Sequence, residues 1–145
     1  MDLNKAIIMG HVGMDPIFLT FENGEDMAKF SVATSRKWTD KISGEKKEAT
    51  TWHNVVIFNK YLVKLTERFV IKGTKVYIEG ELKTRNYMKD DIKRYVTEII
   101  VPQVKGEMLI IAKGKGWTDS GPPAQLNQPS ENVQTQGEYE DDIPF

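Results

Sequence analysis

Apolar and polar residues alternate along most of the first 111 positions of the chain. Short runs rich in β-branched and aromatic residues are separated by clusters of Gly, Asn, Asp and Lys, which is the pattern of β-strands joined by turns. We expect loops at 37–49 and 87–93. The expected strands are 4–12, 17–21, 27–35, 50–58, 74–85 and 94–101, with a short further strand over 108–111.

One segment departs from this two-residue period. Asn59 is a favourable N-cap, and Gly73 ends the segment. The apolar residues between them follow helical spacing: Tyr61, Leu62, Leu65 and Phe69. Strands, one helix and further strands within about 110 residues indicate an all-β fold, a small closed Greek-key barrel with one helix across an end. An open sandwich with a stray helix is the alternative.

The alternation stops at Ala112, and the chain becomes rich in Gly, Pro, Gln, Asn and Ser. This composition cannot bury enough apolar surface to offset chain entropy, so we expect 112–137 to be a disordered linker. The last eight residues, 138–145, combine clustered acids with Ile143 and Phe145, which a merely solubilising tail does not require. We therefore predict three parts: a folded domain over 1–111, the linker, and an acidic tip.

The strand expected over 50–58 is apolar on both faces. Alternation puts His53, Val55 and Ile57 on one face, with Trp52, Asn54, Val56 and Phe58 on the other. Since only one face of a strand can line a small barrel, the second face either contacts another subunit or receives a flat apolar ligand. A simpler alternative is that Trp52 and Phe58 are both core residues.

Cations and aromatic rings are interleaved at three places. Trp38 follows Arg36 and Lys37, Phe58 precedes Lys60, and Lys83 and Arg85 share strand parity with Tyr87. Single-stranded nucleic acids bind to such surfaces because cations neutralise phosphates while unstacked bases lie on the rings. Each cation taken alone is equally well explained as part of a solvated surface.

Composition and charge exclude several classes of functional site. The 145 residues include no cysteine, which excludes disulfides, thiolate metal sites and cysteine nucleophiles, and which fits the cytoplasm. The net charge of −1 divides into +3 over 1–111 and −4 over 112–145. His11 and His53 lack an acidic partner at metal-ligand spacing, and no apolar run is long enough to span a bilayer. We predict no metal, cofactor, membrane segment or catalytic site.

Several motifs occur in a fixed order along the chain. Gly10-x-x-Gly13-x-Asp15-Pro16 follows Leu3-Asn4-Lys5, and Phe30-Ser31-Val32-Ala33-Thr34-Ser35 precedes Trp38. Trp52-His53-x-Val55-Val56-x-Phe58 and Gly73-x-x-Val76-Tyr77-Ile78-Glu79-Gly80-x-Leu82-x-Thr84-Arg85 come next, and the last motif is Asp141-Asp142-Ile143-Pro144-Phe145. In this order the motifs resemble those of bacterial single-stranded DNA-binding proteins, and the resemblance covers nearly all of 1–101 and the last five residues.

The resemblance implies an OB-fold (oligonucleotide/oligosaccharide-binding) barrel that forms a homotetramer and binds single-stranded DNA without sequence preference in replication, recombination and repair. It implies base stacking on Trp38, Trp52, Phe58 and Tyr87, although Tyr87 stands where tryptophan is common, and it associates His53 with a subunit interface. The basic positions that it implies are Lys5, Lys41, Lys60, Lys72, Arg85 and Arg94, to which the cation–aromatic pattern adds Arg36, Lys37 and Lys83.

For the acidic tip, the resemblance implies docking of Ile143, Pro144 and Phe145 into pockets of replication, recombination and repair proteins, with Asp141 and Asp142 meeting basic residues around them. Two other functions stay open at this point. One is an RNA-binding module with the same barrel. The other is a metal-dependent nuclease that uses the pairs Asp90-Asp91 and Asp141-Asp142.

Overall fold

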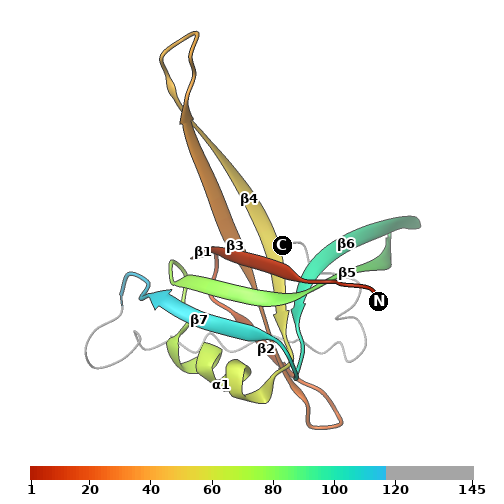
Figure 1. The fold of residues 1–145 in the computed structure, drawn as a ribbon. Helices are drawn as coiled ribbons and strands as arrows, with labels where there is room; N and C mark the ends of the chain where they lie inside the picture. The colour runs from red at the N-terminus through yellow and green to blue at the C-terminus, as the bar shows by residue number, and fades with distance from the viewer. Residues whose placement is uncertain (117–145) are drawn as a thin grey trace.

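The computed structural model describes residues 1–116, which form seven strands and one helix (Figure 1). The elements are β1 (Ala6–Val12), β2 (Ile17–Thr20), β3 (Asp26–Thr39), β4 (Lys46–Ile57), α1 (Lys60–Phe69), β5 (Lys75–Lys89), β6 (Ile92–Val101) and β7 (Glu107–Ala112). The predicted order of strands, helix and strands is confirmed. Most of the predicted linker and the whole tip, with Asp141, Asp142, Ile143, Pro144 and Phe145, lie outside the described residues.

The strands close into a barrel. They pair in the order β1-β3-β4-β6-β5, and a further pairing of β1 with β5 joins the two ends. The β4–β6 pair is parallel, whereas the other strand pairs are antiparallel. This is the closed Greek-key arrangement of an OB fold, and the open sandwich is excluded. β2 pairs with β3, and β7 extends the sheet beside β5.

The barrel interior holds one continuous apolar core. Its buried side chains come from every barrel strand and from α1, and include Val32, Val55, Ile78, Ile99 and Leu62. The helix begins where the sequence predicts, because the Asn59 side chain accepts a hydrogen bond from the Leu62 backbone N–H at 3.0 Å. Its apolar face then packs on the core, which holds α1 beside β7 (Figure 1).

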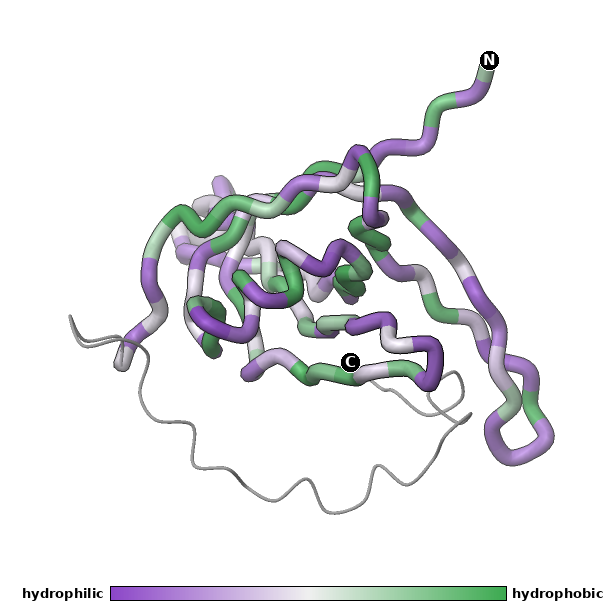
Figure 2. Tube along the Cα trace, turned by 90° about the horizontal axis from the view of Figure 1, so that it is seen from below, coloured by the Kyte–Doolittle hydropathy of each residue, from purple (hydrophilic) through white to green (hydrophobic). Residues whose placement is uncertain are grey.

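Two strand pairs continue beyond the barrel as two-stranded ribbons, and here the predicted loops are wrong. β3 and β4 stay paired as far as Thr39 and Lys46, so most of 37–49 is strand. β5 and β6 pair as far as Lys89 and Ile92, and the turn consists of Asp90 and Asp91, both with positive φ. A ribbon outside the barrel has no face against the core, so the sequence shows no apolar alternation there. Figure 2 shows that the outer part of the β5–β6 ribbon is mostly hydrophilic.

Three charged residues meet on the outer side of the barrel wall. The Arg85 guanidinium donates to both Glu98 carboxylate oxygens, from Nε at 3.1 Å and from Nη2 at 3.2 Å. Lys29 is fully buried, and burial lowers its pKa to about 7; the Glu98 charge opposes this shift and the Arg85 charge adds to it. Burial of Lys29 therefore lowers the free energy of unfolding, by an amount that depends on pH.

We expect the substitution Lys29→Met to raise the free energy of unfolding at pH 7 by at least ~1 kcal/mol, because an apolar side chain of similar length avoids the desolvation of an amine. Below pH 7 Lys29 is protonated in both folded and unfolded protein, so the advantage of Met is constant. Between pH 7 and pH 10.5 only the unfolded protein keeps that proton, so the wild type gains stability with rising pH and the advantage shrinks. Urea unfolding of both proteins from pH 6 to pH 10 measures this difference, and a pH-independent difference would contradict the interpretation.

Candidate nucleic-acid interface

The two faces of β4 separate as the sequence predicts. His53, Val55 and Ile57 pair with β3 residues that face the core, and Val55 and Ile57 are completely buried. Trp52 lies on the outer face, where 57% of its surface is exposed. The alternative in which Trp52 is a core residue is therefore wrong.

The ring of Trp52 rests on the backbone of the segment after β1. A Cβ atom added to Gly13 would lie 2.2 Å from Cζ3 of this ring, so the close contact requires glycine. The Gly13 N–H donates to the Ser31 carbonyl at 3.0 Å, which ties this segment to β3. Trp52 is thus held against the barrel with much of its ring facing solvent.

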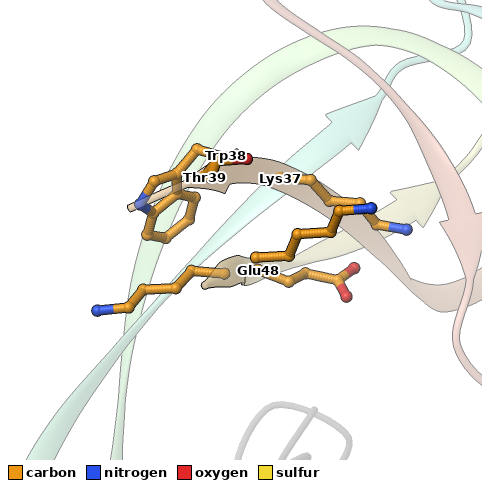
Figure 3. A pocket seen from close by; sticks show the side chains of 6 residues that line it. Lys37, Trp38, Thr39 and Glu48 are labelled. Atoms are coloured by element: carbon orange, nitrogen blue, oxygen red, sulfur yellow. The ribbon is translucent and has the colours of Figure 1, made fainter. Parts of the chain in front are cut away.

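Trp38 lies near the end of β3 in the β3–β4 ribbon, and not on a loop as the sequence suggests. It is 39% exposed, and the guanidinium carbon of Arg36 lies 5.3 Å from its ring centroid. Beside the ring is a shallow hollow of about 480 Å³, shown in Figure 3. The residues that line it are Lys37, Trp38, Thr39, Lys46, Lys47 and Glu48.

The two tryptophans lie on opposite faces of the ribbon. Directly paired residues of an antiparallel sheet share a face, and Trp38 pairs with Lys47 whereas Trp52 pairs with Ala33. Trp38 therefore shares its face with the odd-numbered residues of β4, among them His53, and Trp52 has the other face. Sequence parity alone did not show this, because it required the register between the strands.

Asp40 organises the tip of the β3–β4 ribbon. Its carboxylate accepts hydrogen bonds from the backbone N–H groups of Ile42 and Ser43, and it forms an ion pair with Lys47 at 2.9 Å. Lys47 and these N–H donors hold the pKa of Asp40 below its usual value. The predicted phosphate contact Lys41 is exposed in this ordered turn.

Phe58 and Lys60 lie where β4 leads into α1. Phe58 follows β4 directly and is half-buried, and its backbone N–H donates to the Val101 carbonyl at 3.0 Å. Lys60 is the first residue of α1 and is exposed. The ring is therefore more covered than those of the two tryptophans.

The β5–β6 ribbon carries the third predicted cation–aromatic group. Lys83 is exposed, Tyr87 is half-buried, and Arg94 pairs directly with Tyr87 from β6. Lys83, Arg85 and Tyr87 share one face, as their parity predicts. Arg85 differs from the other predicted cations because Glu98 holds its guanidinium, an ion pair that strand parity did not indicate.

The remaining predicted residues have diverse surroundings. Lys5 forms an ion pair with Glu79 at 3.2 Å, while the backbone N–H of exposed Lys72 donates to Asp15. His53 Nε2 lies 2.8 Å from Thr34 Oγ1 across the β3–β4 pair.

In residues 1–116 there is neither a cluster of three metal-ligating side chains nor a helix long and apolar enough to cross a membrane.

Tyr95 is an exposed ring that the sequence reasoning missed. It is 66% exposed, and the Lys93 ammonium lies 5.7 Å from its ring centroid. Tyr95 lies on the ribbon face opposite that of Arg94 and Tyr87. The polar neighbours with which it shares parity, Lys93 and Thr97, are the sequence signal that could have identified it.

Known proteins match both the sequence and the fold. The profile of the family described as "Single-strand binding protein family" matches residues 3–106. Single-stranded DNA-binding proteins of Rickettsia typhi and Rhizobium meliloti are 35% and 34% identical, over 99% of this chain and 97% and 98% of theirs. A solved structure described as "Plasmodium falciparum SSB complex with ssDNA" superposes with a TM-score of 0.70 at 33% identity, covering 77% of this chain and 96% of that one.

Proposed function

The chain belongs to the single-strand binding protein family, whose members bind DNA and are not enzymes, and from this we propose that it binds single-stranded DNA without sequence preference. The observation that carries the proposal is the presence of two exposed tryptophan rings, one of which contacts a cation. Trp52 is 57% exposed on the barrel wall, and Trp38 is 39% exposed with the Arg36 guanidinium over its ring and Lys47 directly paired with it. Rings of this kind stack with any base, and cations bind any phosphate.

The opposite orientation of the two tryptophans favours a single strand over a duplex. A strand that stacks on both Trp38 and Trp52 must pass around an edge of the β3–β4 ribbon, because the rings lie on its two faces. Duplex DNA has a persistence length of about 50 nm and does not bend on this scale without a large cost. A single strand follows such a path with its bases unstacked.

The proposed contacts fall into two sets. Trp38, Trp52, Phe58 and Tyr87 stack with bases, and the family resemblance and their partial exposure support this role. The proposed phosphate contacts are Lys5, Arg36, Lys37, Lys41, Lys60, Lys72, Lys83, Arg85 and Arg94. We also propose a cytoplasmic location, because the similar proteins of Rickettsia and Rhizobium are bacterial and a bacterial chromosome lies in the cytoplasm; cell fractionation tests this location.

Trp52→Ala and Trp38→Ala are each expected to weaken binding of oligo-dT by about 1–3 kcal/mol, because each removes one stacking surface. Tyr61→Ala is the matched control, since Tyr61 is 72% exposed on α1, outside the proposed contacts. Competition for a fluorescently labelled oligo-dT measures the affinities, with oligo-U and duplex DNA as further competitors. Equal affinities of the Trp52→Ala, Trp38→Ala and Tyr61→Ala variants for oligo-dT would refute the stacking role. If oligo-U competes as well as unlabelled oligo-dT, the protein tolerates RNA.

We also propose a homotetramer, on two features of the sheet that β1, β5 and β7 form. Over Ala6–Met9 the described pairing of β1 is with β5, so the other edge of β1 can pair with a second copy. The outer face of this sheet exposes Ile7, Met9, Leu109 and Ile111, each between 48% and 53% exposed. Neighbouring apolar side chains exposed in this way are typical of a subunit contact.

Met9→Asp is expected to reduce the assembly to dimers or monomers, because it places a charge at the centre of the proposed contact. Ile42→Asp is the control, since Ile42 is fully exposed at the tip of the β3–β4 ribbon. Sedimentation velocity distinguishes four 16.6-kDa chains from fewer. A wild-type monomer, or a Met9→Asp tetramer, would contradict this interface.

For the acidic tip we propose recruitment of replication, recombination and repair proteins. An aromatic side chain close to Asp141 and Asp142 suits an apolar pocket rimmed by basic residues. We expect a peptide of residues 138–145 to bind such a partner at least tenfold more tightly than the same peptide without Phe145, because the ring supplies most of its apolar surface. Fluorescence anisotropy measures both affinities, and equal values would rule out docking by the ring.

A further inference from the structure

Glu98 is a buried carboxylate at the centre of the proposed DNA-binding face. It pairs directly with Asn54 of β4 on one side and with Lys83 of β5 on the other, so its side chain points to the same outer face as theirs. Trp52 lies two residues before Asn54 on that face. Only 4% of the Glu98 surface is exposed.

A carboxylate in this position is unexpected for a surface that binds phosphates. At a separation of several ångströms its charge repels a phosphate, and partial burial strengthens the repulsion because solvent screens it less. The structure supplies an opposite charge, because Arg85 donates two hydrogen bonds to Glu98.

The two-pronged contact fixes the orientation of Arg85. A guanidinium is planar and carries five N–H donors, and the bonds from Nε and Nη2 use one edge of it. Guanidinium N–H groups match the spacing of phosphate oxygens, so a guanidinium held in one orientation presents donors to phosphate in a fixed geometry. Without Glu98 the arginine side chain would lose two of the hydrogen bonds that order it, and DNA binding would cost more conformational entropy.

We propose that Glu98 is a positioning residue of the DNA-binding face, which holds the guanidinium of Arg85 in the orientation that contacts phosphate. This inference rests on the proposed binding of single-stranded DNA. Removing this negative charge from the binding face is therefore expected to weaken the binding of a polyanion, which is the opposite of the effect that simple charge repulsion predicts.

The test compares Glu98→Gln with Glu81→Gln. Both substitutions remove one negative charge, and Glu81 is an exposed residue on the same face of β5, two positions before Lys83. We expect Glu98→Gln to weaken oligo-dT binding about fivefold. The slope of the logarithm of the binding constant against the logarithm of the salt concentration should become shallower by up to about 0.7, the value of one phosphate contact on a single strand. Glu81→Gln is expected to bind as tightly as the wild type or more tightly.

Arg85 variants separate positioning from charge and from folding. Arg85→Lys keeps the charge but loses the two-pronged contact, so we expect it to bind almost as weakly as Arg85→Ala. Adding Glu98→Gln to Arg85→Ala should cause no further loss. The thermal unfolding curve of each variant shows at which temperatures it is folded, and the binding constants are compared only at those temperatures.

The outcomes are distinct. If Glu98→Gln binds as tightly as the wild type, or Arg85→Lys does, Glu98 has no positioning role. If the wild type itself does not bind oligo-dT, the proposed function fails and this inference fails with it.

Discussion

The fold depends on a change of partner within one strand. β5 pairs with β1 as far as Gly80 and with β6 from Glu81 onward, and this change closes the barrel and starts a ribbon beyond it. A Cβ atom at Gly80 would lie 2.4 Å from the Ile100 carbonyl oxygen, so the two backbones approach this closely only at a glycine. Closure creates the enclosed core, and the core in turn fixes which face of each strand points outward.

Only one portion of each of the strands β3, β4, β5 and β6 contributes side chains to the core. The other portion extends beyond the barrel and is available for other interactions. The cross-strand register continues from Val32 and His53 in the barrel to Trp38 and Lys47 in the ribbon without interruption. The barrel therefore determines on which side each ribbon residue lies, even far from the core. The opposite placement of Trp38 and Trp52 is a consequence of that register, and it produces a surface suited to a flexible polymer.

Local signals in the sequence predicted much of this arrangement. The Asn59 cap, the two faces of β4 and the shared face of Lys83, Arg85 and Tyr87 all follow from short-range periodicity. The extent of the ribbons did not follow, because alternation is visible only where one face is buried. The pairing of Arg85 with Glu98 was also invisible, since it joins residues thirteen positions apart whose contact depends on the β5–β6 register. A buried lysine at position 29 contradicts the usual preference of lysine for the surface, so no residue-type rule predicts it.

The charge distribution explains how a chain with a net charge of −1 can have a surface for a polyanion. At physiological ionic strength charges interact over about 8 Å, so a phosphate responds to the few groups nearest to it and not to the total. Two of the cations form ion pairs with carboxylates, Arg85 with Glu98 and Lys47 with Asp40. Each carboxylate restricts a cation or orders a turn, and this order reduces the entropy that binding must overcome. Acidic residues on such a surface can therefore contribute to the binding of phosphate, provided that each one holds a cation in place.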